Sequence, residues 1–312
     1  MAESTQKKRT KLVYKLLFKV AFSVALLVAL VFYIDLESVL ERLRQVNYLW
    51  VLLASAMLFG GQVLSAIRWT WLARGLGLTV RTSRKIQLYF LGLFLSLFLP
   101  SIIGGDVARG FLLARGRKGA GWMAAGSVIL ERINGLLALL VLITVCMFFV
   151  DIPSHWRTMW LFCVVALWLG MLSYPFWHHR LPRLLHRWRG LPINQPVFIR
   201  AWWRAMLLSL TFQTLVITTT MLLGYAAGLD ISWAAYGVMV GLVAIASTAP
   251  ISFNGFGIRE AGYVGLASYF GGNPEAAAVM AALWVIVLAI VAAPGAWVLW
   301  KLGGTSALKE KK

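Results

Sequence analysis

Charged residues are scarce in this chain, and acidic ones are the scarcest. Only 13% of the 312 residues are charged, and 11 Asp+Glu stand against 30 Lys+Arg. A soluble globular domain carries about a quarter charged residues, so the composition excludes that class, and the high apolar content excludes intrinsic disorder. A protein that binds nucleic acid through basic patches is polar as well as positive. We therefore expect no nucleic-acid partner.

Residues that bind metals are also few. The two cysteines, Cys146 and Cys163, lie in apolar runs without the spacing of a metal-ligand pair, and we interpret both as buried thiols. Three of the four histidines, His178, His179 and His186, lie in a basic loop rich in tryptophan, where contact with lipid headgroups is the simpler interpretation. We predict neither a metal site nor a cofactor.

Apolar sequence is abundant instead, with hydrophobic residues making up 60% of the chain. A helix needs about 20 apolar residues to cross the hydrocarbon core of a bilayer. Eight runs approach this length, at 16–34, 49–69, 86–100, 121–150, 159–177, 205–228, 233–250 and 277–300. Two shorter pieces, 106–113 and 259–270, cannot span alone. We predict an all-α polytopic membrane protein, one integral membrane domain over 1–312, with about eight main transmembrane helices and two broken return segments.

Basic residues predict the orientation of these spans. If the N-terminus is cytoplasmic and each short piece makes a return pass, the basic clusters at 7–15, 68–85, 115–118, 180–204 and 301–312 all fall in the cytoplasm. The cations left outside are then Arg42, Arg44 and Arg157. By the positive-inside rule, we predict a multi-pass protein of the cell inner membrane. Its cytoplasmic parts are the N-terminus 1–15, the loop 178–204 and the tail 301–312.

Six charged residues remain inside the membrane besides Lys19, which can snorkel to the interface. They are Arg109, Arg132, Arg259, Asp106, Glu131 and Glu260. Each charge at a helix centre costs about 2.5–3.5 kcal/mol on insertion scales, so three arginines at depth need partners or a ligand. Asp106 and Arg109 are three residues apart and can pair on one helix. Adjacent residues such as Glu131 and Arg132 cannot face each other, so we expect their partners on other segments.

Two similar motifs mark the return segments. The turn residues are Pro100, Gly104 and Gly105 in the first motif, and Pro250, Asn254, Gly255 and Gly257 in the second. In both motifs a glycine lies five residues after the proline and an arginine nine residues after it. Proline ends the incoming helix, glycine permits a tight reversal, and a new half-helix begins with free amides that attract anions. Because the two incoming helices run in opposite directions, the pair also predicts an inverted-topology repeat.

The order of these motifs resembles the lysylphosphatidylglycerol synthase transmembrane-region family, also called flippase-like integral membrane proteins. The resemblance covers nearly the whole chain and rests on Leu99-Pro100, Gly104-Gly105-Asp106, Arg109, Glu131-Arg132, Pro250 and the run 255–260. At Asn254 the family commonly has glycine. The family's best-known members carry a soluble aminoacyltransferase domain after the membrane part, whereas only 301–312 follow the last helix here. The resemblance therefore implies lipid translocation, or an accessory membrane role, rather than synthesis of a lysyl-lipid.

The first functional hypothesis is flippase-like translocation of an anionic lipid, either a phospholipid or a polyprenyl-phosphate-linked lipid. Arg109, Arg259 and Arg132 would bind the lipid phosphate, because the planar arginine fork binds phosphate bidentately and stays charged. Asp106 and Glu260 would hold the arginines in the absence of lipid. Glu131 would couple transport to protons, since a desolvated carboxyl titrates towards neutral pH. Anionic lipid headgroups are the expected partners.

Two alternatives remain open at the level of sequence. The chain could be a membrane enzyme acting on lipid-linked phosphate or sugar, with the acids as bases or metal ligands and the arginines as a clamp for negative charge. The acids are scattered singly along the chain, which argues against this hypothesis. Alternatively, the chain could be a non-transporting scaffold of an envelope lipid pathway, in which the buried charges only hold the helices together.

Overall fold

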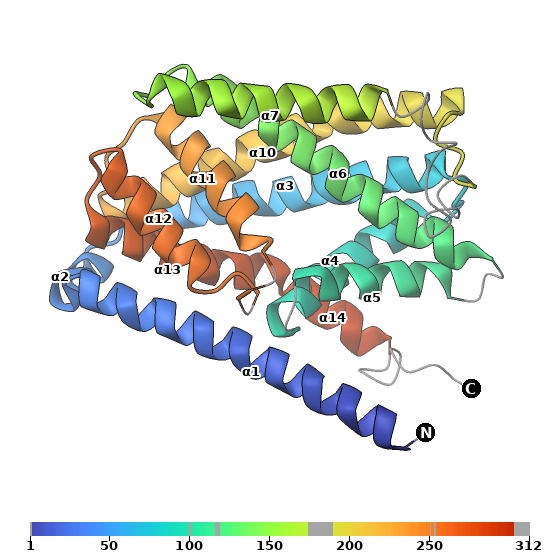
Figure 1. The fold of residues 1–312 in the computed structure, drawn as a ribbon, viewed down its shortest axis with the longest axis horizontal. Coiled ribbons are helices and arrows are strands. Elements are labelled where there is room, and N and C mark those ends of the chain that lie inside the picture. The colour runs from blue at the N-terminus through green and yellow to red at the C-terminus, as the bar shows by residue number, and fades with distance from the viewer. Residues whose placement is uncertain are drawn as a thin grey trace.

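The computed structural model describes residues 2–99, 102–115, 119–173, 190–249, 251–252 and 254–302, without the side chains of 2–16, 102 and 103. In that part of the chain every regular element is an α-helix (Figure 1). In chain order the helices are α1 (Ala2–Tyr33), α2 (Leu36–Arg44), α3 (Tyr48–Gly75), α4 (Thr82–Phe98), α5 (Ile102–Ala114), α6 (Ala120–Met147), α7 (Ser154–Leu172), α10 (Pro196–Ala227), α11 (Trp233–Ser247), α12 (Ile258–Tyr269), α13 (Pro274–Ala292) and α14 (Pro294–Lys301). The all-α prediction is confirmed.

Some sequence predictions fall outside the described residues. These are the turn prolines Pro100 and Pro250, residues 178–189 of the basic loop and residues 303–312 of the tail.

Local capping explains where several helices begin and end. The side chains of Asn47, Ser232 and Asn273 accept backbone N–H groups at the starts of α3, α11 and α13. Such acceptors satisfy amides that have no partner within the helix. Helix α10 ends at Gly228, whose φ of 77° lies in the left-handed region that glycine adopts without strain. The polar residues between the apolar runs therefore set the helix boundaries.

Five helical stretches in the described residues are long and apolar enough to cross a membrane. They are α3, α6, α7, α10 and the stretch Pro274–Lys301, which contains α13 and α14. A sixth span results if Leu17–Tyr33 and α2, which are bent by 87° relative to each other, count as one broken span. The chain is therefore a polytopic helical membrane protein, but the prediction of eight main transmembrane helices is wrong.

The number of spans is lower than predicted because two of the helices are too short to cross the membrane. The predicted spans 86–100 and 233–250 correspond to α4 and α11, which have 17 and 15 residues. At 1.5 Å per residue these helices reach about 25 and 22 Å, less than the ~30 Å hydrocarbon core. Both helices end just before a Pro/Gly motif, at Phe98 and Ser247. The run 86–100 was itself too short to span, and the run 233–250 counted apolar residues beyond the end of α11.

Each short helix folds back against the one that follows it, giving two helical hairpins (Figure 1). The first hairpin is α4 with α5, and the second is α11 with α12. The predicted short pieces 106–113 and 259–270 are indeed short helices, of 13 and 12 residues in α5 and α12. The two hairpins come from distant parts of the chain, and the inverted-topology repeat they suggest stays a prediction.

The ends of the two hairpins touch. The Asn254 side chain, in the turn of the second hairpin, donates from Nδ2 to the carbonyl oxygen of Ser96 near the end of α4, at 2.8 Å. Asn254 has a φ of 51°, and Gly255 and Gly257 have φ values of 80° and 82°. Asparagine is one of the few residues besides glycine that adopt this left-handed conformation. Asn254 therefore fits a turn position that favours glycine, and it adds a contact that glycine cannot make.

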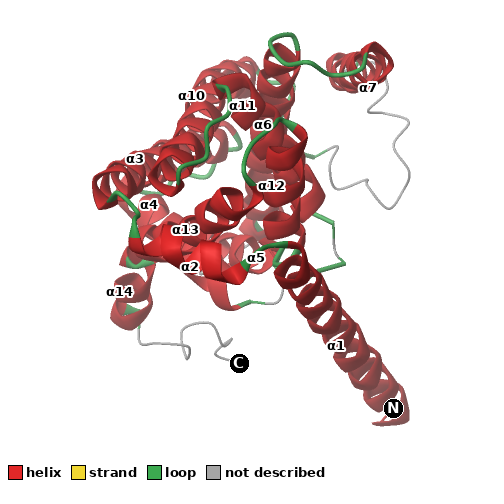
Figure 2. Cartoon of the chain, turned by 90° about the vertical axis from the view of Figure 1, so that its left-hand side faces the viewer, coloured by secondary structure: helices red, strands yellow, loops and turns green. Residues whose placement is uncertain are grey.

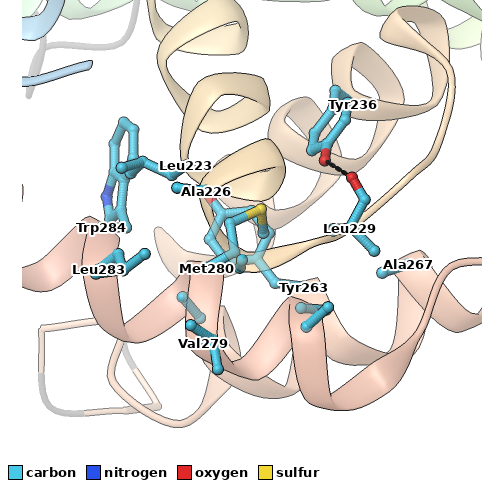
Figure 3. Close-up of a cluster of buried hydrophobic side chains, with 14 of the residues drawn as sticks. Leu223, Ala226, Leu229, Tyr236, Tyr263, Ala267, Val279, Met280, Leu283 and Trp284 are labelled. Carbon is cyan, nitrogen blue, oxygen red and sulfur yellow. Dashed lines mark hydrogen bonds between the residues drawn. The ribbon is translucent and has the colours of Figure 1, made fainter. Parts of the chain in front are cut away.

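The largest apolar core lies between α10, α11, α12 and α13 (Figure 3). Leu223, Met280 and Tyr263 meet in it from three of these helices. Tyr236 carries a polar group into this core, and its hydroxyl donates to the carbonyl oxygen of Leu229 at 2.9 Å. A buried hydroxyl needs such a partner. This core holds the second hairpin firmly against the long helices.

Helices α1 and α7 lie at the periphery of the bundle (Figure 2). Helix α7 has no buried residue, and apolar side chains such as Phe162 point outwards along it. In a membrane protein such faces contact lipid tails. Cys146 on α6 is buried as predicted, but Cys163 on α7 is exposed, so its interpretation as a buried thiol was wrong. An apolar run shows that a residue avoids water, but not whether it faces protein or lipid.

Candidate functional site

Three helices bring five charged side chains together inside the bundle. The Glu131 carboxylate on α6 binds Arg68 of α3 through Oε1, and Nη2 of Arg109 on α5 through Oε2 at 2.5 Å. The same Nη2 atom of Arg109 lies 2.9 Å from Oδ1 of Asp106. Oδ2 of Asp106 accepts from Nε of Arg132 at 2.7 Å. We call this row of alternating charge, Arg68–Glu131–Arg109–Asp106–Arg132, the central cluster.

The central cluster runs from the interior of the bundle to its surface. The Arg109 and Glu131 side chains are each 2% exposed, while the Arg132 side chain is 58% exposed. Taking a charge out of water costs several kcal/mol unless a partner compensates it. Each buried carboxylate here has two arginine partners. The structure thus contains the Asp106–Arg109 pair that the spacing predicted, and the partners of Glu131 and Arg132 come from other helices, as expected.

Aromatic rings fix the central arginine in place. The Arg109 guanidinium lies 4.7 Å from the ring centroid of Trp69 and 4.8 Å from that of Tyr89. Trp69 is itself oriented by a hydrogen bond from Nε1 to Oγ of Ser127 at 3.1 Å. Cation–π contacts of this kind contribute about 0.5–2 kcal/mol each. Arg109 is therefore held in one orientation by rings as well as by carboxylates.

A polar network holds the inner end of the cluster. Arg68 donates to Ser209 of α10 and to Ser65 of α3, both at 2.9 Å. Ser209 in turn donates to Asn134 at 2.6 Å, and Tyr89 donates to Ser65 at 2.8 Å. The network links α3, α4, α6 and α10. Movement of any one of these helices would therefore disturb the position of Arg68.

The central cluster has more positive than negative charge. Three arginines face two carboxylates, so one positive charge is uncompensated. Nε of Arg68 and both Nε and Nη1 of Arg109 are buried without a hydrogen-bond partner in the described part of the chain. Unsatisfied buried donors cost about 1–3 kcal/mol each. Excess positive charge together with unused donors is the chemistry of an anion-binding site.

A second, smaller group of charges lies at the start of α12. Nε of Arg259 is 3.2 Å from Oε1 of Glu260, and its guanidinium lies 5.1 Å from the Phe256 ring centroid. Oε2 of Glu260 accepts from the backbone N–H of Gly257 at 2.7 Å. The carboxylate therefore caps the helix and holds the arginine at once. Within the described residues, no ion pair joins Arg259 to the central cluster.

The predicted turn glycines occupy different places in the two motifs. Gly255 and Gly257 lie in the turn before α12, whereas Gly104 and Gly105 lie within α5. A Cβ atom on Gly105 would collide with the carbonyl oxygen of Gly92 on α4. The glycines of the first motif therefore permit close packing of two helices, not a reversal of the backbone.

Sequence reasoning missed Arg68, which it assigned to a cytoplasmic basic cluster. Arg68 is 4% exposed and binds Glu131. The run 49–69 already contained it, and Ser65 lies three residues earlier on the same helix face. A polar pair at that spacing inside an apolar run was the available signal. Among the residues described, no group of three or more His, Cys, Asp or Glu is placed to hold a metal ion.

Comparison with known families gives one match. The family model described as the lysylphosphatidylglycerol synthase TM region matches residues 16–295. That range contains every residue of the central cluster and both hairpins. No curated protein matches the chain.

Proposed function

The chain belongs to the lysylphosphatidylglycerol synthase TM region family, and on that premise we propose that it translocates an anionic lipid across the membrane. Family membership supports a lipid-related function in the membrane. The excess positive charge of the central cluster supports the finer proposal that the chain translocates a lipid with an anionic headgroup. Phospholipids and polyprenyl-phosphate-linked lipids share the phosphate that this cluster would bind.

The central cluster favours a phosphate by charge and by geometry. Asp106 and Glu131 carry two negative charges against three arginines, and a phosphate supplies the missing negative charge. It also supplies acceptors for the unused Nε and Nη1 donors of Arg109. Arginine forms shorter and stronger hydrogen bonds to phosphate oxygens than neutral donors do. Inside a low-dielectric bundle such contacts are stronger than in water.

The exposed end of the cluster is the first contact in this proposal. Arg132 reaches the bundle surface, and its partner Asp106 is shared with Arg109. A phosphate that binds Arg132 displaces Asp106, which then pairs with Arg109 alone. The phosphate next exchanges places with Asp106 on Arg109. Each step replaces one ion pair with another, so neither step breaks an ion pair without forming a new one.

The second hairpin supplies the next arginine. Arg259 lies at the start of α12, and the turn before it touches α4 through Asn254 and Ser96. Glu260 holds Arg259 as Asp106 holds Arg132, and a phosphate releases it in the same way. In this proposal Glu131 is the fixed counter-ion of Arg68 and Arg109. Its role in coupling transport to protons stays a prediction.

Reconstituted vesicles test the proposal. The purified chain should accelerate the crossing of fluorescent phosphatidylglycerol between leaflets, and a parallel arm uses a fluorescent polyprenyl phosphate. Arg109→Gln and Arg259→Gln should return the rate to that of protein-free vesicles. Arg44→Gln removes one positive charge from α2, outside both groups of charges, and should keep the wild-type rate. Wild-type rates in both Arg109→Gln and Arg259→Gln would refute the proposal.

A double variant separates phosphate binding by Arg109 from a purely structural role of the buried charges. Asp106→Asn with Arg109→Gln removes one charge of each sign from the cluster, so the bundle keeps its charge balance. If the charges only hold the helices together, this variant folds and retains full lipid crossing. If Arg109 binds the phosphate, the variant folds but lipid crossing is lost. Size-exclusion chromatography in detergent shows whether the variant remains folded.

A further inference from the structure

A cavity of about 230 Å³ lies away from the central cluster, surrounded by the ends of three helices. Arg84 and Leu88 line it from the start of α4, Leu112 and Leu113 from the end of α5, and Leu302 from the end of α14. We call this cavity the hairpin-end pocket. Figure 1 shows α4, α5 and α14 together in this part of the bundle.

The charged lining of the hairpin-end pocket has one sign. Among the residues that the structure describes, its charged lining residues are Arg84 and Arg115, and none is acidic. Helix α4 starts at this pocket, and no side chain caps its N-terminus. The positive end of the helix dipole adds to the arginine charges. Arg115 lies six residues beyond Arg109, about 9 Å along the chain direction of α5 at 1.5 Å per residue, so the pocket is separate from the central cluster.

The remaining lining is apolar. Leu88, Leu112 and Leu113 are buried, and Val80 and Leu302 complete the wall. Inorganic phosphate gains nothing from a wall of leucines, because its binding depends on charge and hydrogen bonds. An amphiphile with a phosphate beside an acyl chain uses both parts of the pocket. The lining therefore favours a lipid over a soluble anion.

The predicted topology places the hairpin-end pocket on the cytoplasmic side of the membrane. Arg84 belongs to the basic cluster 68–85 and Arg115 to the cluster 115–118, both of which the positive-inside rule places in the cytoplasm. The cytoplasmic leaflet carries anionic lipids, and basic pockets between transmembrane helices on that side bind their headgroups. We propose that the hairpin-end pocket binds an anionic phospholipid of the cytoplasmic leaflet. Arg84 and Arg115 hold its phosphate, and the leucine wall holds the start of an acyl chain.

Native mass spectrometry of the full chain in detergent tests this site. The protein is titrated with phosphatidylglycerol, with phosphatidylcholine and with inorganic phosphate in separate arms. Arg84→Gln with Arg115→Gln should weaken the binding of one phosphatidylglycerol molecule by about tenfold or more, since each charge-assisted contact is worth at least that factor. Val80→Trp fills the pocket without changing charge, and it should also weaken phosphatidylglycerol binding.

Matched controls keep the result specific. Arg200→Gln with Arg204→Gln removes two exposed arginines from the start of α10, on the same predicted side of the membrane, and should leave binding unchanged. Repeating the titration in an Arg109→Gln background separates loss at the pocket from loss at the central cluster. Wild-type binding in the Arg84/Arg115 double variant would overturn the proposal. Equal binding of phosphatidylcholine or of inorganic phosphate would overturn the assignment to an anionic lipid.

Discussion

The Nε atom of Arg132 donates to Oδ2 of Asp106 at 2.7 Å, although 58% of the Arg132 side chain is exposed. The other oxygen of the same carboxylate lies 2.9 Å from Arg109, whose side chain is 2% exposed. One aspartate thus bridges an arginine at the bundle surface and an arginine in the interior. A change at either arginine acts on the same carboxylate, but with different consequences for stability.

Arg132→Gln should slow lipid crossing while leaving the fold nearly as stable. Only the Arg132 end of this ion pair is exposed, and the buried Asp106 keeps its second partner, Arg109. Arg109→Gln instead removes a partner from two buried carboxylates, which costs about 3–5 kcal/mol. Unfolding in detergent, followed by tryptophan fluorescence, measures the difference. Equal losses of stability in the two variants would contradict the graded burial of the cluster.

Arg68 and Glu131 should behave as a coupled pair. Glu131→Gln leaves two buried arginines with less compensation, and Arg68→Gln removes one of them. The double variant should therefore lose less stability than the sum of the two single variants. Coupling between residues in contact is typically about 0.5–3 kcal/mol. A double-mutant cycle of unfolding free energies measures this coupling, and additive losses would show that the Arg68–Glu131 pair does not stabilise the fold.

Asn254 should tolerate glycine better than alanine. Both variants lose the hydrogen bond to Ser96, which contributes about 0.5–1.5 kcal/mol. Only alanine must also adopt a φ of 51°, and the left-handed conformation costs an L-residue about 1–2 kcal/mol. Asn254→Ala is therefore expected to unfold at a lower temperature than Asn254→Gly. A reversed order would mean that the turn does not constrain the backbone at this residue.

Composition and the lengths of the apolar runs predicted the membrane class correctly, because burial in lipid requires apolar sequence whatever the tertiary contacts. The same signal failed at α4 and α11, since hydropathy does not register where a Pro/Gly motif ends a helix. The Pro/Gly motif, in turn, predicted a backbone reversal at Gly105, although the residue lies inside α5. Helix length depends on local backbone chemistry that an average over a window does not resolve.

Sequence reasoning identified most residues of the central cluster, but fewer of the ion pairs between them. Asp106, Arg109, Glu131 and Arg132 were found because charges at membrane depth are costly and therefore informative. Arg68 was missed because it is near the end of an apolar run, where a snorkelling cation and a buried one look alike in sequence. Its burial depends on Glu131, which is 63 residues away in the chain. Only the packing of α3 against α6 decides whether Arg68 is a snorkelling cation or a buried one.

Gly105→Ala should impair both stability and lipid crossing. The added Cβ would collide with the carbonyl oxygen of Gly92 and with Oγ of Ser96, so α5 must shift away from α4. Overpacking of this kind costs about 1–3 kcal/mol, and the shift would also move the neighbouring Asp106 within the central cluster. Gly60→Ala on α3 is the matched control, because nothing lies within 4 Å of its added Cβ. That control should be neutral or stabilising by up to about 1 kcal/mol. Unfolding in detergent and the vesicle assay report the two effects, and wild-type behaviour of Gly105→Ala would show that close packing of α4 and α5 is not required.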